Sequence, residues 1–265
     1  MINKLTLQSA INKYYLGEIE SVKWIIKENT LYVSFMSLNK EVIGKLTYRN
    51  FNVEDCELAI FDTKKLLNLI NITSGDLLLS LEKTKSINTK LHIADNSFNL
   101  TYALADPLLI AKTGTVNEPE WDAILPLERE FVDHLIKAKS ALQGVDNMTI
   151  NPTKDLNDTN VCIFSFGDEN GHNNRITYQV YGEIQPSDVN IPFNSDSFKN
   201  ILSANKDLEE GTISINYEGL MKLNFKSEDS ESEYFLIRKE QSAFWFYMYV
   251  YENNIVARAQ VIFLN

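Results

Sequence analysis

The chain is poor in the residues that interrupt regular structure, with only six Pro and ten Gly among its 265 residues. It contains instead 12 Tyr and 14 Phe, which favour packed strands over flexible linkers. Its two cysteines, Cys56 and Cys162, form no CxxC pair and have no His at ligand spacing. We therefore expect two reduced thiols rather than a disulfide or a metal site.

Long apolar runs are also missing. No segment approaches the ~20 apolar residues that a membrane-spanning helix needs, and residues 1–5 do not open the apolar stretch of a secretion signal. The sequence thus predicts a cytoplasmic protein with no membrane partner.

Positive charge is scarce, with 25 Lys and Arg against 36 Asp and Glu and a net charge of −11. This balance disfavours a general nucleic-acid-binding surface. Catalytic motifs are lacking as well. His92, His134 and His172 belong to no HExxH or HxH pattern, and the chain has no glycine-rich phosphate loop and no GxSxG motif. We expect no enzymatic activity, no metal and no cofactor.

What the chain does contain is an internal repeat. Residues 61–71 and 193–203 match at a shift of 132 positions. Each segment has a Phe, a capping residue (Asp62 or Asn194), a Thr or Ser, and then apolar residues at i, i+3 and i+4 spacing, which predicts a capped amphipathic helix. A period of this length in a chain about twice as long indicates two similar domains.

We predict an α+β fold of two similar β-rich domains, each with two short helices against an antiparallel sheet. The first domain covers residues 1–106, an extended connector 107–122, the second domain 123–238, and a C-terminal extension 239–265, which we interpret as a β-hairpin with strands at 244–251 and 255–263. The early helix of each domain is expected at 6–16 and 128–142. Strands are expected at 22–27, 31–36, 42–48, 57–61, 77–81, 90–94, 98–104, 148–150, 161–166, 175–181, 189–193, 213–217, 220–225 and 233–237.

Three segments of the first half carry a family resemblance. They are 58–70, 91–95 (Leu-His-Ile-Ala-Asp) and 102–107 (Tyr-Ala-Leu-Ala-Asp-Pro). Together they resemble the DNA polymerase sliding clamps of T-even-type bacteriophages, which have the clamp fold of proliferating cell nuclear antigen. In that family a strand ending in Ala-Asp precedes one ending in Ala-Asp-Pro, which opens the interdomain connector. The match covers residues 55–107, the second half agrees in the order of its elements, and the tail after Arg238 departs from the pattern.

The resemblance implies an architecture and a set of partners. Subunits would associate head to tail into a closed homotrimer, with helices lining the central hole and strands forming the outer wall. Duplex DNA would thread the hole without sequence readout. A DNA polymerase would be tethered, an ATP-driven clamp loader would open the ring, and the location would be the bacterial host cytoplasm if a phage encodes the chain.

Lysines on the polar sides of the expected helices are the candidate DNA-binding residues. Lys64 and Lys65 point away from the apolar stripe of their helix, and the early helices match at a shift of 124 positions, which pairs Lys13 with Lys137. Lys139 and Lys199 lie on the flanks. Surface lysines that only confer solubility are the simpler explanation for any one of them. As a set they predict a channel face that contacts phosphates and not bases, inside an acidic exterior that repels DNA.

A docking pocket for partner peptides is expected near the connector. The candidates are Leu108, Leu109 and Ile110 on the connector, with Tyr234 and Leu236 on the last repeated strand. Ordinary core packing is the alternative for each residue, and an exposed apolar patch would favour docking.

A second function class fits the same composition. A multimeric β-rich structural component of a virus particle would also be acidic and strand-rich. The duplicated strand–helix unit with lysines on its polar faces favours the clamp, and a hydrolase has no constellation to support it.

Overall fold

The computed structural model describes residues 1–85, 87–167, 174–239, 251–252 and 255–256. Within them the chain forms short helices and mostly antiparallel sheets, which confirms the predicted α+β fold class. The helices are α1 Lys4–Tyr15, α2 Thr63–Asn71, α3 Arg129–Ala141, α4 Ser195–Ala204 and the 3-10 turn η1 Pro107–Leu109.

The first half builds two sheets of four strands. One has the order β4-β3-β2-β5 and the other the order β1-β6-β7-β8. Their bounds are β1 Ile2–Asn3, β2 Val22–Lys27, β3 Thr30–Met36, β4 Val42–Tyr48, β5 Cys56–Ile60, β6 Asp76–Thr84, β7 Ile87–Ala94 and β8 Asn99–Ala103.

The second half repeats this arrangement strand for strand. Its sheets have the orders β12-β11-β10-β14 and β9-β15-β16-β17, with the short β13 added beside β9. Their bounds are β9 Ala123–Pro126, β10 Asn147–Lys154, β11 Asn160–Phe166, β12 Ile176–Tyr181, β13 Glu183–Ile184, β14 Ile191–Asn194, β15 Glu210–Asn216, β16 Leu220–Lys226 and β17 Ser230–Ile237.

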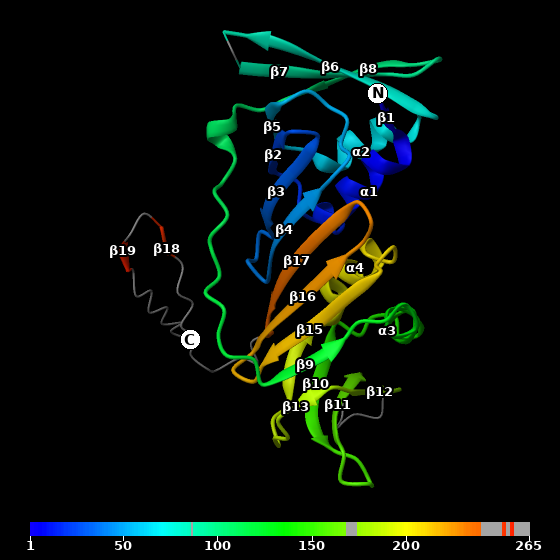
Figure 1. The fold of residues 1–265 in the computed structure, drawn as a ribbon, viewed down its shortest axis with the longest axis vertical. Helices are drawn as coiled ribbons and strands as arrows, with labels where there is room; N and C mark the ends of the chain where they lie inside the picture. The colour runs from blue at the N-terminus through cyan, green and yellow to red at the C-terminus, as the bar shows by residue number, and fades with distance from the viewer. Residues whose placement is uncertain (86, 168–173, 240–250, 253–254, 257–265) are drawn as a thin grey trace.

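The two halves are joined edge to edge. Strand β17 pairs antiparallel with β4, from Ser230 opposite Tyr48 to Leu236 opposite Val42, so that one sheet from each half merges into a nine-stranded sheet. The helices lie on one side of this sheet and the extended connector runs along the other (Figure 1). Because α1 contacts both α2 and α4, helices from the two halves also pack on each other.

The repeated segments form equivalent capped helices. The Asp62 side chain accepts a hydrogen bond from the Lys65 N–H, and the Asn194 side chain accepts from the N–H groups of Asp196 and Ser197. The hydroxyl of the next residue donates a hydrogen bond to the loop that follows the domain's first helix. Thr63 donates to the Glu20 carbonyl at 2.9 Å, and Ser195 donates to the Val145 carbonyl at 2.8 Å. The cap bonds satisfy free N–H groups of the first turn, and the hydroxyl bonds fix each helix to its domain.

Beyond Lys239, the tail is described at only two places. Tyr251–Glu252 (β18) pairs antiparallel with Ile255–Val256 (β19), and the remainder of the hairpin expected at 244–251 and 255–263 lies outside the described residues. Within the described chain, no helix combines the length and apolarity that crossing a membrane requires.

Candidate nucleic-acid interface

Four of the six candidate lysines lie on accessible parts of the helices. Lys64 and Lys65 on α2 and Lys137 on α3 are exposed, and Lys199 on α4 is half-buried. None of the four forms an ion pair with another described residue. Their ammonium groups are therefore available to a ligand on the helical side of the molecule.

Lys13 was expected on this surface, and that prediction is wrong. Its side chain is only 1% exposed, and Nζ lies 2.6 Å from Asp207 Oδ1 and 3.2 Å from Asn205 Oδ1. The cause is the packing of α1 against α4, which turns Lys13 into the junction between the two halves. Burial lowers the pKa of Lys13, and its hydrogen bond to Asp207 opposes this shift.

Lys139 is also buried rather than channel-facing. It is 5% exposed, and its Nζ forms an ion pair of 2.9 Å with Asp196 Oδ1 in the first turn of α4. Helices α3 and α4 pack side by side, so a lysine on that side of α3 meets α4 instead of solvent.

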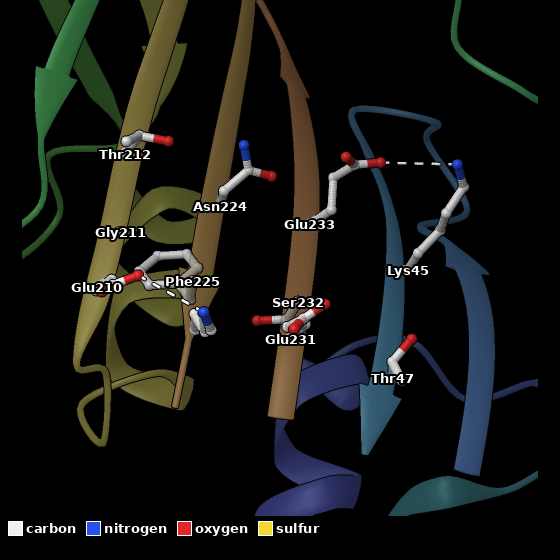
Figure 2. Close-up of a pocket in the computed structure, with 11 residues that line it drawn as sticks. Lys45, Thr47, Glu210, Gly211, Thr212, Asn224, Phe225, Glu231, Ser232 and Glu233 are labelled. Carbon is white, nitrogen blue, oxygen red and sulfur yellow. Dashed lines mark ion pairs between the residues drawn. The ribbon is translucent and has the colours of Figure 1, made fainter. Parts of the chain in front are cut away.

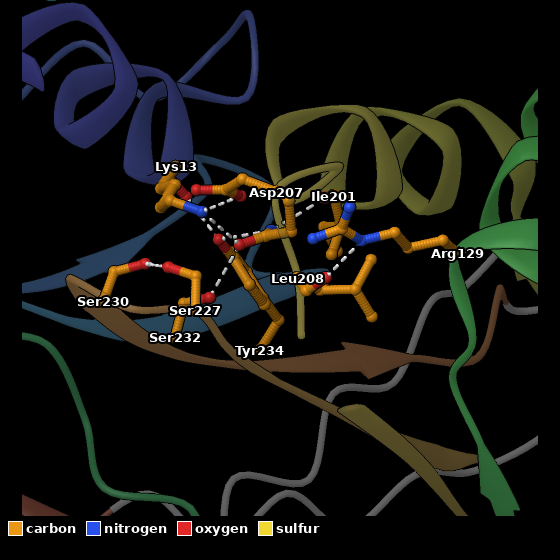
Figure 3. A network of polar contacts seen from close by, with 10 residues as sticks. Lys13, Arg129, Ile201, Asp207, Leu208, Ser227, Ser230, Ser232 and Tyr234 are labelled. Atoms are coloured by element: carbon orange, nitrogen blue, oxygen red, sulfur yellow. Dashed lines mark hydrogen bonds and ion pairs between the residues drawn. The ribbon is translucent and has the colours of Figure 1, made fainter. Parts of the chain in front are cut away.

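A buried polar network lies at the junction of the two halves, where Figure 3 shows Lys13, Ser232 and Tyr234 close together. Asn205 is its centre. Its Oδ1 accepts from Lys13 Nζ and, at 2.8 Å, from Ser232 Oγ. Its Nδ2 donates to the Ile201 carbonyl at 2.8 Å and to the Tyr234 hydroxyl at 2.9 Å, and Tyr234 in turn donates to the Lys13 carbonyl at 2.7 Å. The network links α1, α4 and β17, and burial raises the pKa of Tyr234.

The residues expected to form a peptide pocket are not brought together. Leu108 and Leu109 are 91% and 78% exposed and Ile110 is half-buried, but Tyr234 and Leu236 are both 0% exposed. The part of the prediction that placed Tyr234 and Leu236 on a docking surface is wrong. Their side chains point to the helical side of β17, where Tyr234 packs on Phe35 and joins the Asn205 network.

The outer face of the joined sheet carries an open polar pocket of about 510 Å³ (Figure 2). Five of its 11 lining residues are charged. Among them are Lys45 and Glu233, whose Nζ and Oε1 lie 3.7 Å apart. The lining residues are Lys45, Thr47, Glu210, Gly211, Thr212, Asn224, Phe225, Lys226, Glu231, Ser232 and Glu233. This composition fits a polar or charged ligand better than an apolar peptide.

The connector is held to the second half by side chains of β15 and β16. Lys222 Nζ pairs with Glu118 Oε1 at 2.5 Å and with Glu233 Oε2 at 2.8 Å, and lies 5.4 Å from the centre of the Phe235 ring. The Asn216 side chain donates to the Glu120 carbonyl at 3.0 Å. These bonds direct the chain into β9, which begins at Ala123.

Two cations on the helical side were missed by sequence reasoning. Arg129 begins α3 and donates its Nε to the Leu208 carbonyl at 2.8 Å, and Lys206 is exposed just after α4. Their positions in the sequence could have identified them. Arg129 lies in the first turn of a predicted helix and Lys206 just after the last turn of another, and cations at the ends of a helix are commonly exposed. Together with Lys64, Lys65, Lys137 and Lys199, they add to the accessible cations of the described helices, among which lie the acidic residues Glu130, Asp133 and Asp196.

The described residues contain no group of three or more His, Cys, Asp and Glu placed to hold a metal ion. Cys162 is buried and Cys56 is half-buried, and both are free thiols. Burial raises the pKa of Cys162 to about 12 and of Cys56 to about 11, so neither is an activated nucleophile.

The chain has the fold of the sliding clamps. It superposes on proliferating cellular nuclear antigen from Entamoeba histolytica with a TM-score of 0.67 and 16% identity, covering 90% of this chain and 96% of that one. Similar structures are the A. fulgidus antigen bound to the C-terminal region of FEN-1 (TM-score 0.70, 15% identity, 91% and 98% coverage) and the PCNA2–PCNA3 complex of Sulfolobus tokodaii (TM-score 0.67, 13% identity, 90% and 98% coverage). No protein-family model and no curated protein sequence matches the chain.

Proposed function

We propose that the protein is a sliding clamp of the T-even bacteriophage type, which encircles duplex DNA and tethers a DNA polymerase. The observation that carries the proposal is the duplication itself: two equivalent units are joined edge to edge by β17 and β4, with all four helices on the same side of the joint (Figure 1). The likeness to solved clamps supports the fold, and the particle-component alternative gains nothing from it.

The joint within the subunit indicates how subunits would join. By the equivalence of the halves, β17 corresponds to β8 and β4 corresponds to β12. Both β8 and β12 are outermost strands of their sheets within the described chain, and their free backbone groups can pair with another strand. A β12–β8 joint between subunits would repeat the β17–β4 joint, which makes a head-to-tail contact.

Head-to-tail contacts generate a ring when the rotation closes. We propose a homotrimer, in which six similar units surround the hole and present their helices to it. Lys64, Lys65, Lys137 and Lys199 then face the phosphates of the duplex. A ring retains DNA by topology and needs only weak contacts, which agrees with a net charge of −11. An ATP-driven loader would open the ring.

A test of the ring uses charge on the two edges. Thr101 on β8 and Thr177 on β12 are exposed, and replacing both by Asp places like charges on facing strands, where they repel. We expect the Thr101→Asp/Thr177→Asp protein to run as a monomer in light scattering at concentrations where the parent is a trimer.

The matched control is Ser34→Asp/Asn52→Asp, which adds the same charge at exposed positions of β3 and of the loop before β5. We expect this control to remain trimeric. A parent chain that is monomeric throughout a dilution series, with and without primed DNA, would reject the clamp.

A further inference from the structure

The inference concerns the open edge of strand β6 and rests on the proposed ring. In the second half, the equivalent strand β15 is covered along its outer edge by β9, which pairs from Ile215 opposite Ala123 to Thr212 opposite Pro126. In the first half, β1 covers β6 only at Asp76 and Leu77. Residues 78–84 of β6 have no partner on that side within the described chain.

The open edge leaves apolar side chains partly uncovered. Ile213 and Ile215 of β15 are both 0% exposed, whereas the equivalent Leu79 and Leu81 of β6 are only half-buried and Leu78 is 58% exposed. An apolar strand with a free edge is a docking site for an added strand.

The chain leaves the two halves at equivalent points. After β8 the Ala105 N–H donates to the Ala59 carbonyl in β5 at 3.0 Å, and after β17 the Lys239 N–H donates to the Pro192 carbonyl in β14 at 2.8 Å. These points are 134 residues apart. The C-terminal tail therefore begins where a second connector would begin.

The same shift places a strand-like sequence at the end of the tail. The connector, residues 107–122, leads into β9, whose Ala123 and Leu125 are buried while Ile124 and Pro126 are exposed. Adding 134 gives residues 241–256 and then Ala257-Arg258-Ala259-Gln260, followed by Val261. This stretch alternates apolar and polar residues in the same phase as β9, as a half-buried strand requires.

We propose that residues 257–260 of one subunit add an antiparallel strand to the open edge of β6 in the next subunit, so that the tail crosses the subunit joint as the connector crosses the joint within the chain. The unit that follows the second half in a head-to-tail ring is the first half of the next copy. The register of β9 on β15 then places Arg258 opposite Ser80 and Ala259 opposite Leu79. The β18–β19 pairing does not oppose this path, because an isolated pair of two-residue strands is marginal in water.

Cross-linking tests the register. In a Cys56→Ser background, Ser80→Cys and Arg258→Cys place two thiols on directly opposite residues, at a separation that a disulfide can span. We expect oxidation to convert most of the protein into covalent dimers and trimers on a non-reducing gel. The matched control, Ser34→Cys with Arg258→Cys, puts the first thiol on an exposed serine of β3 and should leave monomers.

The outcomes separate this proposal from the ring. A monomer in light scattering before oxidation overturns both. A trimer without cross-links, or with a disulfide closed inside one chain, overturns the added strand and leaves the clamp standing.

Truncation supplies a second measurement. A chain ending at residue 256 loses the added strand at every subunit joint, and we expect the concentration at which half the protein is trimeric to rise by about tenfold or more. An unchanged dissociation midpoint would overturn the proposal.

Discussion

Reversing the charge of the four accessible helix lysines should abolish loading of the protein on primed DNA while its oligomeric state stays unchanged. The variant replaces Lys64, Lys65, Lys137 and Lys199 by Glu together. None of these residues is part of the β8 or β12 strands, and none forms an ion pair with another described residue. Association with a duplex depends on cations that neutralise phosphates, so we expect loading to fall by on the order of 100-fold or more.

The measurement is processive synthesis on a primed template with the polymerase and loader that the proposed function requires. The matched control replaces Lys27, Lys40, Lys83 and Lys226, which are exposed and lie on strands or turns. Both variants move the net charge from −11 to −19, since each Lys→Glu change subtracts two charges. Only the helix variant should lose function. Equal losses in both would mean that total charge matters and that the helices have no special role.

Salt offers an independent check of the same four residues. Contacts to phosphate weaken as salt rises, because binding releases condensed counterions. As the salt concentration rises, the parent protein should stay bound longer to closed circular DNA than to linear DNA. A closed circle keeps the ring threaded when the lysine–phosphate contacts fail, whereas a linear duplex lets it slide off the end.

Much of the fold could be predicted because its signals are local. The caps at Asp62 and Asn194 and the apolar spacing after them identified α2 and α4, and their recurrence predicted the duplication. The Phe that precedes each cap was less informative. Phe61 is 44% exposed and Phe193 is 0% exposed, so the matching letters occupy different environments.

The site was harder to predict because burial of a helix face depends on the neighbouring element. The sequence match that paired Lys13 with Lys137 is one residue out of register, because α1 begins at Lys4 and α3 at Arg129, which makes Lys13 the tenth residue of its helix and Lys137 the ninth. Lys13 is buried where α1 packs on α4 across the junction, while Lys137 is exposed. Sequence period gives the face of a helix and not what covers it. The prediction for Tyr234 was wrong for a related reason. The alternation of side chains along a strand does not show which face of β17 packs against the helices.

Replacing the buried amide of Asn205 at the junction should lower the free energy of unfolding more than replacing an exposed amide on the same helix. Asn205 is 0% exposed and takes part in four hydrogen bonds, with Lys13, Ser232, Tyr234 and the Ile201 carbonyl. An Asn205→Ala protein leaves the Ser232 hydroxyl without its acceptor and the Lys13 ammonium with Asp207 alone, in a site that excludes water. Unsatisfied buried groups cost ~1–3 kcal/mol each, so we expect the free energy of unfolding to fall by roughly 3 kcal/mol.

Chemical denaturation measures this effect, with the free energy of unfolding of Asn205→Ala compared with that of the control variant Asn200→Ala. Asn200 lies on the same helix and donates one hydrogen bond, of 3.0 Å, to the Leu16 carbonyl from an exposed position, so its loss should cost about 1 kcal/mol or less. The larger effect at Asn205 follows from where its partners lie. They come from α1 of the first half and from α4 and β17 of the second, so the substitution loosens the joint between the halves. Equal losses for the two variants would show that the network adds nothing beyond a single surface bond and that apolar packing alone holds the joint.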